Sequence, residues 1–433
     1  MADPFRIGIA GLGTVGAGVV DVIQKNGALL AQRAGRPIEI VCVNARDKAK
    51  DRGVDLSGYD WVDQAEDMAA RDDIDAVIEM IGGSEGTAYD LVKGGLGGGK
   101  HVVTANKALV AHHGVELAEL AEGNNAGLAY EAAVAGGIPV IKGLREGAAA
   151  NRIERVYGIL NGTCNYILSA MESDGRDFAD VLKDAQDMGY AEADPSFDID
   201  GVDAAHKLAI MASLCFGTQL DFEGVELAGI RKILAADIAQ ARDLGYRIRL
   251  IGHAEIDGEN GDACLFQRVS PRLVSKQHPL AHVTDATNAV VAEGNFSGRL
   301  LFQGAGAGDK PTASAVVADI VDIARGEMGP AFAMATGDLQ AMQRAPSGHR
   351  RSKVYLRMMV ADKPGVLAEI AAAMRDADVS IESLIQTEVE DGSALIAMVT
   401  HECREQAITD TLETLSGSDS LLGEPMVMHL LRD

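Results

Sequence analysis

Residues 5–16 read FRIGIAGLGTVG and lead directly into AGVVDVIQK. The first six predict a short buried strand, and the residues after Gly16 carry apolar side chains at helical spacing. The glycines between them form a G-x-G-x-x-G turn, which indicates a dinucleotide site when a strand precedes it and a helix follows. There Gly11 allows the tight bend, Gly13 lets the backbone approach a pyrophosphate, and Gly16 lets the helix pack on the strand. We expect cofactor contacts from these glycines and from Thr14 and Val15; a glycine turn without a ligand is the alternative.

The composition is that of a globular protein with several domains. The chain has 433 residues, of which 47% are hydrophobic and 24% charged, and this length suggests about two to four domains. A net charge of −25 argues against a nucleic-acid partner, because phosphates would repel the chain. The five cysteines show no metal-binding spacing. No signal-peptide pattern and no run of ~18 apolar residues is present, so we expect a cytoplasmic protein without a membrane partner.

The next expected strand bears on the choice of dinucleotide. It spans residues 38–43, IEIVCV, and ends at Asn44 instead of the Asp or Glu that commonly holds the ribose of NAD. Arg46 and Lys48 follow, and both could bind a 2′-phosphate. We therefore favour NADP as the cofactor, with NAD as the alternative; these charges could also simply solvate the loop. Two more strand-like runs follow, at residues 74–81 and 101–104.

An acidic segment in the middle of the chain carries a second pattern. Residues 185–207 read AQDMGYAEADPSFDIDGVDAAHK, in which glycine, proline and apolar residues interrupt the carboxylates. Asp203 and Lys207 stand at i and i+4, so they meet on one face of a helix. Carboxylates could hold the ammonium group of an amino acid, and a lysine could transfer a proton. An EF-hand loop fails because Lys207 occupies the twelfth position, where a glutamate is needed; a solvated acidic loop is the other interpretation.

Several shorter strings add to these two patterns. The chain contains VTANKAL at 103–109, EAAVAGGIPV at 131–140, LNGTCNYIL at 160–168 and a second glycine loop, QGAGAGDKPT, at 303–312. In the first string Lys107 opens a helix, which is a poor position for a cation in the helix dipole and therefore of interest. A polar linker at 345–352 precedes a βαββαβ pattern that contains DKPGVL at 362–367.

Together these strings resemble the homoserine dehydrogenases over the whole chain, and the C-terminal pattern resembles an ACT domain. The resemblance implies the interconversion of L-homoserine and L-aspartate 4-semialdehyde with NAD(P)(H). It implies Lys207 as general acid/base, Lys107 between cofactor and substrate, and Asp203 as the group that positions Lys207 or the substrate. The other implied substrate contacts are Glu192, for the ammonium group, and Gly189, Tyr190 and Thr163.

The same resemblance implies further cofactor contacts and a cation. The cofactor would also contact Lys107, Gly189, Gly306 and Gly308, the last two in the second glycine loop. A monovalent cation such as Na⁺ would be held by the glutamate and the backbone carbonyls of the 131–140 string. The implied ligands are Glu131, Val134, Gly136 and Ile138.

The expected fold class is α/β, with three domains. They are a Rossmann-type nucleotide-binding domain at 1–135 plus 304–345, an α+β substrate and dimerisation domain at 136–303, and a ferredoxin-like ACT domain at 353–433. The first domain is therefore expected to be discontinuous. The family further implies a homodimer or homotetramer, a place in threonine and methionine biosynthesis, and threonine as an effector at the ACT domain.

Two other functions remain as alternatives. An aspartate-semialdehyde dehydrogenase would need an activated cysteine with a histidine base, and Cys164 has no conspicuous histidine partner in the sequence. A non-catalytic sensor would not need Lys107, Asp203 and Lys207 together. The ACT-like module could also be a dimerisation unit that binds no ligand.

Overall fold

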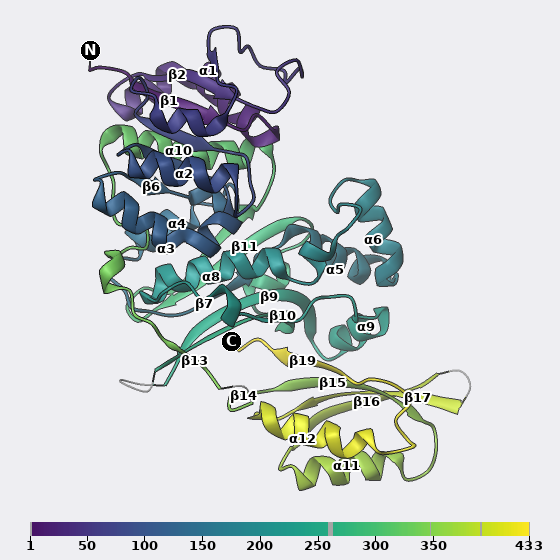
Figure 1. Ribbon diagram of the computed structural model, residues 1–433. Coiled ribbons are helices and arrows are strands. Elements are labelled where there is room, and N and C mark those ends of the chain that lie inside the picture. Colours follow the sequence, from purple (N-terminus) through teal and green to yellow (C-terminus); the bar gives the residue numbers. More distant parts are fainter. Residues whose placement is uncertain (1, 259–262, 347, 390–391, 433) are drawn as a thin grey trace.

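The computed structural model describes residues 2–258, 263–346, 348–389 and 392–432. Figure 1 shows three parts that follow one another along the molecule: purple to blue with one green helix, teal, and yellow-green. Residues 1 and 433, the outer limits of the first and third expected domains, lie outside the described residues. Within the described ranges, no helix combines the length and apolar character needed to cross a bilayer.

The N-terminal part is a doubly wound α/β unit, as expected. Its six strands pair in parallel in the order β3-β2-β1-β4-β5-β6. The strand order reverses between β1 and β4, and ligands bind at such a switch point, outside the carboxyl ends of the strands. The strands are β1 (Phe5–Ala10), β2 (Ile38–Asn44), β3 (Asp60–Trp61), β4 (Ala76–Glu79), β5 (His101–Thr104) and β6 (Leu128–Ala129), and the main helices are α1 (Thr14–Ala34), α2 (Thr87–Gly97) and α3 (Lys107–Gly123).

Strand β4 is shorter than the sequence predicts. The expected run covered residues 74–81, whereas the strand covers Ala76–Glu79. The Glu79 carboxylate accepts hydrogen bonds from the backbone N–H groups of Ile81 and Gly82, at 2.7 and 2.9 Å. These bonds turn the chain away from the sheet directly after Glu79, which ends the strand.

The chain returns to this unit after the middle part. Helix α10 (Asp309–Arg325), the green helix among the purple and blue elements of Figure 1, packs on α1 and shares its apolar core. The approach is close, since a Cβ on Gly18 would lie 3.1 Å from the Cβ of Ala313. On this packing we propose the division 1–135 plus 304–345, 136–303 and 353–433.

The middle part is an antiparallel sheet covered by helices. Its strands run in the order β12-β11-β7-β9-β10. Helix α8 packs on β7, β9 and β10, and every residue from Asp203 to Leu214 is buried. The strands are β7 (Ile153–Ile159), β9 (Tyr246–Asp257), β10 (Cys264–Ser275), β11 (Thr287–Gly294) and β12 (Gly298–Ala305), and the helices include α5 (Gly162–Asp174), α6 (Phe178–Asp187), α8 (Val202–Phe216) and α9 (Ala235–Asp243).

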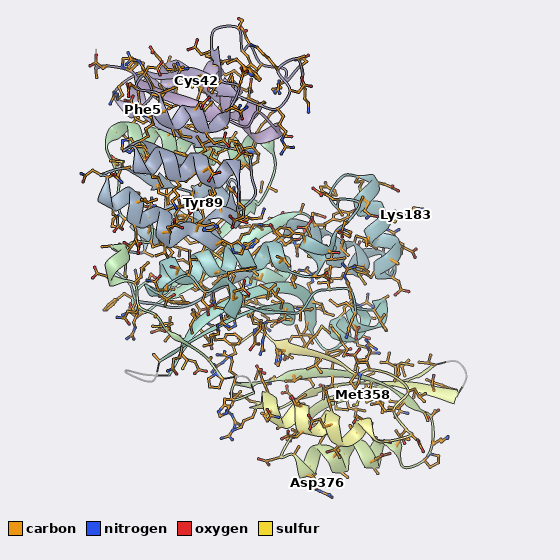
Figure 2. All side chains as sticks on the ribbon, viewed as in Figure 1. Phe5, Cys42, Tyr89, Lys183, Met358 and Asp376 are labelled. Carbon is orange, nitrogen blue, oxygen red and sulfur yellow. The ribbon has the colours of Figure 1, made fainter. Side chains whose placement is uncertain are left out.

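The C-terminal part has the βαββαβ order that the sequence predicts, with Met358 in its core (Figure 2). Its strand β19 also pairs in parallel with β10, through Arg272 opposite His429 and Leu273 opposite Leu430. The sheets of the middle and C-terminal parts are therefore continuous, which no local pattern indicated. The elements are β15 (Val354–Ala361), α11 (Val366–Asp376), β16 (Ile381–Val389), β17 (Ser393–Thr400), α12 (Glu405–Ser416) and β19 (Met426–Leu430).

Gly16 and Gly27, both in α1, can be compared to test how tightly the glycine turn is packed. A Cβ on Gly16 would lie 2.0 Å from the carbonyl oxygen of Gly11, whereas one on Gly27 would meet nothing within 4 Å. We expect Gly16→Ala to lower the free energy of unfolding by about 1–3 kcal/mol through overpacking. Gly27→Ala should raise it by up to about 1 kcal/mol, because alanine favours the helix. Urea denaturation measures both; equal effects of the two variants would contradict the tight packing of the turn.

Candidate active site

A cleft of about 1060 Å³ lies between the nucleotide-binding part and the middle part. It opens beside the start of α1, where the switch point of the parallel sheet places a ligand. Ten of the residues singled out in the sequence line it: Val15, Lys107, Gly136, Thr163, Gly189, Tyr190, Asp203, Lys207, Gly306 and Gly308.

At the centre of the cleft, one carboxylate lies between two lysines. Asp203 Oδ2 is 2.7 Å from Lys207 Nζ, and Asp203 Oδ1 is 3.3 Å from Lys107 Nζ. The i, i+4 contact predicted from sequence is therefore present on α8. The bridge to Lys107 joins α8 to α3 of the nucleotide-binding part, so the two lysines reach the same point from opposite walls.

The first turns of two helices place Asp203 and Lys107. Asp203 sits in the first turn of α8, where a carboxylate is favoured by the helix dipole. Gly201 precedes this helix with φ 91°, a left-handed conformation that turns the acidic segment into the helix. Lys107 is the first residue of α3, whose cap Asn106 accepts a hydrogen bond from Leu109 N–H. The ammonium group of Lys107, at the start of α3, thus faces Asp203 across the cleft.

Two polar residues that the sequence analysis did not single out complete this centre. The Asn161 amide donates to Asp203 Oδ2 at 2.8 Å and to Asp198 Oδ1 at 2.7 Å. Its carbonyl oxygen caps α5 by accepting from Cys164 N–H. Asp198 and Asn161 both line the cleft. In the sequence Asn161 reads only as a helix cap, and Asp198 is one of many carboxylates in its segment.

The two carboxyl groups of the cleft differ in their electrostatics. Burial alone would raise the pKa of Asp203, but Lys207, Lys107 and the donated hydrogen bonds outweigh it and lower the pKa from 3.8 to about 2. Burial raises the pKa of Asp198 instead, although Asn161 donates to it. Asp203 therefore stays ionised and holds both lysines in place.

Lys207 keeps one proton free for a ligand. It is buried, and its acceptors among the described residues are Asp203 and the carbonyl oxygen of Leu160, each at 2.7 Å. An ammonium group has three protons to donate. The third can reach an oxygen placed in the cleft, which suits a proton donor to a substrate hydroxyl or carbonyl.

The glycine turn fits a dinucleotide. Gly11 has φ 93°, and a Cβ there would lie 2.5 Å from the carbonyl oxygen of Met80. A Cβ on Gly13 would meet no described atom within 4 Å, so packing within the protein does not require this glycine. The open space and the N-terminus of α1 suit a diphosphate that approaches the backbone closely. The backbone at Gly13 is therefore open to a ligand.

The loop after β2 carries exposed basic side chains. Asn44 is buried at the end of β2, and its amide donates to the Val62 carbonyl at 2.8 Å. Arg46 and Lys48 are exposed in the next loop, outside the cleft lining. Arg52, which the sequence analysis missed, donates to the carbonyl of Leu12 at 2.9 Å and ties this loop to the glycine turn.

Among the predicted catalytic and substrate-binding residues, Glu192 is the one that does not line the cleft. It is exposed, it is absent from the cleft lining, and its backbone carbonyl accepts from Gln186. Thr163 and Tyr190 do reach the cleft, and the Thr163 hydroxyl donates to the Tyr190 carbonyl at 2.9 Å. A contact from Glu192 to a substrate would therefore need the segment around it to move inward.

The string suggested to bind a cation forms a buried loop beside the cleft. The two carboxylate oxygens of Glu131 accept from the backbone N–H groups of Ile141 and Lys142, each at 2.8 Å. Burial, together with Asp319, raises the pKa of Glu131 to about 7. Among the described residues, no group of three or more His, Cys, Asp or Glu side chains is placed to hold a metal. Any cation here would be bound mainly by backbone carbonyls.

Cys164 has the surroundings of a packing residue. It is buried, its thiol donates to the Asp198 carbonyl, and burial raises its pKa well above the usual value. A thiol with a raised pKa supplies little thiolate and makes a poor nucleophile. The chemistry that aspartate-semialdehyde dehydrogenase requires is therefore not supported at this position.

Comparison with known proteins fits this geometry. Family models for the homoserine dehydrogenase NAD-binding domain, for homoserine dehydrogenase and for the ACT domain match residues 11–131, 139–321 and 354–417. Homoserine dehydrogenase of Neisseria gonorrhoeae is 44% identical over 423 residues, which cover 96% of each chain. The chain belongs to the homoserine dehydrogenase family. Homoserine dehydrogenases are oxidoreductases that act on a CH–OH group.

Solved homoserine dehydrogenases share the fold. That of Thiobacillus denitrificans superposes with a TM-score of 0.92 at 41% identity, covering 99% of this chain and 98% of that one. A hyperthermophilic archaeal homoserine dehydrogenase in complex with NADPH gives a TM-score of 0.64 at 28% identity, covering 76% of this chain and 99% of that one.

The lowered pKa of Asp203 predicts a pH dependence of stability. A folded pKa of about 2 against an ordinary 3.8 means that Asp203 stabilises the fold above pH 4 and that this contribution is lost as the pH falls towards 2. We expect the stability gap between the wild type and Asp203→Asn to narrow by about 2 kcal/mol between pH 5 and pH 2. Urea denaturation at both pH values measures the gap; a constant gap would mean that Asp203 is not held ionised by the lysines.

Proposed function

We propose that the cleft oxidises L-homoserine to L-aspartate 4-semialdehyde, and catalyses the reverse reaction, with NADP as the preferred cofactor, in threonine and methionine biosynthesis. The observation that carries this proposal is the Asp203 carboxylate between Lys107 and Lys207, beside a glycine turn that fits a dinucleotide. Family membership supplies the reaction class, and these residues supply the groups that the reaction needs.

In this mechanism the protein orients the substrate and manages one proton. A bound nicotinamide dinucleotide would supply the acceptor or donor of the hydride. Lys207 donates its third proton to the aldehyde oxygen during reduction, and in its neutral form takes the hydroxyl proton during oxidation. Asp203 keeps the Lys207 amine aimed into the cleft, and Lys107 holds the substrate oxygen from the other wall. We propose that Glu192 takes the substrate ammonium after its segment moves inward.

The role of Lys207 is tested by removing its amine while keeping its bulk. Lys207→Met should lower kcat for homoserine oxidation by ~10²-fold or more, because the proton then has no positioned acceptor. Lys183→Met is the matched control, since Lys183 lies exposed on α6 (Figure 2) and outside the cleft lining. Homoserine-dependent reduction of NADP, followed by absorbance, measures both. Near-wild-type turnover in the Lys207 variant would overturn its assignment.

The preference for NADP is supported by the loop after β2. No acid stands at the end of β2, and exposed Arg46 and Lys48 lie two and four residues beyond Asn44. One archaeal relative is solved in complex with NADPH. A 2′-phosphate would attract these cations, whereas the 2′-hydroxyl of NAD carries no charge.

This preference is tested by replacing two basic residues of the loop after β2, one at a time. Arg46→Ala should raise KM for NADP about tenfold or more and leave KM for NAD nearly unchanged, because only NADP has the 2′-phosphate. Lys50→Ala, which removes an exposed cation farther along the same loop, should change neither constant much. Initial-rate kinetics with each cofactor provide the four constants. Equal effects of Arg46→Ala on both cofactors would show that Arg46 does not bind the phosphate.

We infer that the 131–140 loop holds a monovalent cation such as Na⁺, with Glu131, Val134, Gly136 and Ile138 as the ligands. Each Glu131 oxygen accepts one backbone hydrogen bond, so a lone pair of each remains for a cation. Ala135 and Gly136 have φ 58° and 55°, and this turn brings the loop against Gly306. The cation would fix the loop beside the substrate and cofactor.

We propose a homodimer or a dimer-based tetramer that is formed through β12. This strand ends the sheet and pairs only with β11 among the described strands. Phe296, in the turn before it, is 85% exposed. An open edge with exposed apolar side chains favours pairing with a second copy. Light scattering should give at least twice the 45.4 kDa of one chain; the mass of a single chain would refute the assembly.

We further propose that L-threonine inhibits the enzyme through the ACT domain. Two observations support this: the ACT family model matches residues 354–417, and β19 of this domain continues the sheet of the catalytic part. Because the two sheets are continuous, a ligand at the ACT domain has a direct structural route towards the cleft.

A further inference from the structure

Glu79 is a buried carboxylate that the proposed mechanism does not use. It is the last residue of β4, its relative exposure is 0%, and it is absent from the lining of the catalytic cleft. Its partners among the described residues are three hydrogen-bond donors, none of which is a lysine, arginine or histidine. Burial of a charge is unfavourable unless such donors offset it. The groups that donate to Glu79 therefore indicate what this charge holds in place.

Both carboxylate oxygens of Glu79 accept hydrogen bonds. Oε1 accepts from the backbone N–H groups of Ile81 and Gly82, at 2.7 and 2.9 Å. Oε2 accepts from the hydroxyl of Thr104, at the end of the neighbouring strand β5, at 2.5 Å. A glutamine would turn its NH₂ group towards one of these donors. A carboxylate is therefore the side chain that satisfies all three.

Two hydrogen-bond routes lead from Glu79 to Asn106, the N-cap of α3. On the first route, the hydroxyl oxygen of Thr104 accepts from Asn106 N–H at 2.9 Å. On the second route, through the loop after β4, the carbonyl oxygen of Gly83 accepts from the side-chain amide of Asn106 at 2.6 Å. Thr104 and Asn106 are both buried. One carboxylate thus holds both the backbone and the side chain of the residue at which α3 begins.

These bonds fix the place from which Lys107 reaches across the cleft. Lys107 is the first residue of α3, directly after Asn106. Its ammonium group lies 3.3 Å from Asp203, a longer contact than the 2.7 Å between Asp203 and Lys207. The Lys107 side chain is 33% exposed, so the position of its amine depends on where its backbone is held. Misplacement of a reacting group by about 1 Å can lower a rate by ~10²-fold.

We propose that Glu79 is a positioning residue for the reaction and that it acts by holding Lys107 in the cleft. The inference rests on the proposed function, because it assigns to that reaction a residue outside the cleft. Glu79 touches neither the substrate nor the cofactor in this role. Its charge holds Thr104 and the loop after β4, these hold Asn106, and Asn106 sets the start of the helix that carries Lys107.

A double-mutant cycle between Glu79 and Lys107 tests this role in the full-length enzyme. Glu79→Gln should lower kcat for homoserine oxidation about tenfold or more through misplacement of Lys107, and Lys107→Met should lower it by ~10²-fold. The double variant should match Lys107→Met to within about twofold, because Glu79 acts through this lysine. Two independent effects would multiply. A further tenfold loss in the double variant, or wild-type kcat in Glu79→Gln, would therefore overturn the proposal.

Thr104 gives a second test that does not depend on the folding of the Glu79 variant. Thr104→Ser keeps the hydroxyl that donates to Glu79 and accepts from Asn106, so it should retain kcat to within about twofold. Thr104→Val has nearly the same shape without the hydroxyl, and should lower kcat about tenfold. Equal kcat values in the serine and valine variants would contradict the route through Thr104 and overturn the proposal.

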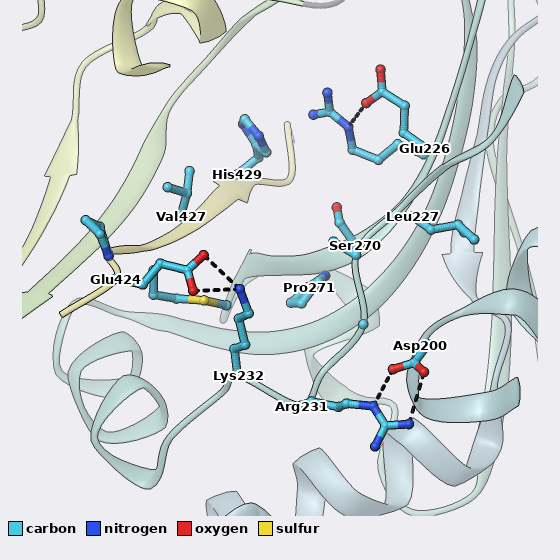
Figure 3. Close-up of a pocket in the computed structure, with 15 residues that line it drawn as sticks. Asp200, Glu226, Leu227, Arg231, Lys232, Ser270, Pro271, Glu424, Val427 and His429 are labelled. Carbon is cyan, nitrogen blue, oxygen red and sulfur yellow. Dashed lines mark hydrogen bonds and ion pairs between the residues drawn. The ribbon is translucent and has the colours of Figure 1, made fainter. Parts of the chain in front are cut away.

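Glu226→Gln is the matched control, because it makes the same substitution outside the cleft. Glu226 accepts from Arg268 at 2.6 Å and lines a separate pocket beside β10 and β19 (Figure 3). This variant should keep the wild-type kcat. An equal loss of kcat in Glu226→Gln would show that the effect is not particular to Glu79, and would overturn the proposal.

A crystal structure of Glu79→Gln provides a readout that does not depend on activity. The Lys107 amine should lie beyond the ion-pair distance of about 4 Å from Asp203. An unchanged contact between Lys107 and Asp203 would overturn the positioning role. Absence of homoserine oxidation in the wild type would instead refute the proposed function, and the structural test of the Lys107 contact would still apply.

Discussion

The carboxylate of Asp203 is the interaction on which the catalytic geometry depends. It holds Lys207 on its own helix, Lys107 from the nucleotide-binding part and the amide of Asn161 at the start of α5. Three elements that are distant in sequence therefore meet at one ionised group. Because the group is buried, its charge is stabilised only while all these donors are present, so the cleft is assembled cooperatively.

Short-range sequence patterns predicted most of the fold. They also predicted the contact between Asp203 and Lys207 in this centre. The glycine turn, the i, i+4 pair of Asp203 and Lys207 and the βαββαβ order are short-range features, and each depends on spacing that a sequence displays directly. What the sequence could not show is which distant groups meet. Nothing near Lys107 indicates that it faces Asp203, and Asn161 resembles an ordinary helix cap until its amide is seen to join Asp198 and Asp203.

Two sequence expectations differ from the structure for physical reasons. Glu192 belongs to the same acidic segment as Asp203, yet it is exposed, and its backbone carbonyl accepts a hydrogen bond from the side chain of Gln186 on α6. The strand expected to reach residue 81 ends at Glu79, whose side chain captures the next two amides. In both places a side-chain interaction, invisible to periodicity, decides where the backbone goes. The domain boundaries, the cofactor preference and the cation ligands remain predictions.

The outer edge of β10 gives the C-terminal module a further role, as a cover for the catalytic sheet. Three short segments cover that edge in succession: β13 (Gln343–Arg344), β8 (Glu226–Leu227) and β19. They come from the linker, the catalytic part and the ACT domain. A strand that is left bare presents unpaired backbone groups and tends to aggregate. Loss of the C-terminal module would expose unpaired backbone groups of β10 where β19 now pairs with it. The C-terminal module therefore covers an edge of the catalytic sheet, whether or not a ligand binds to it.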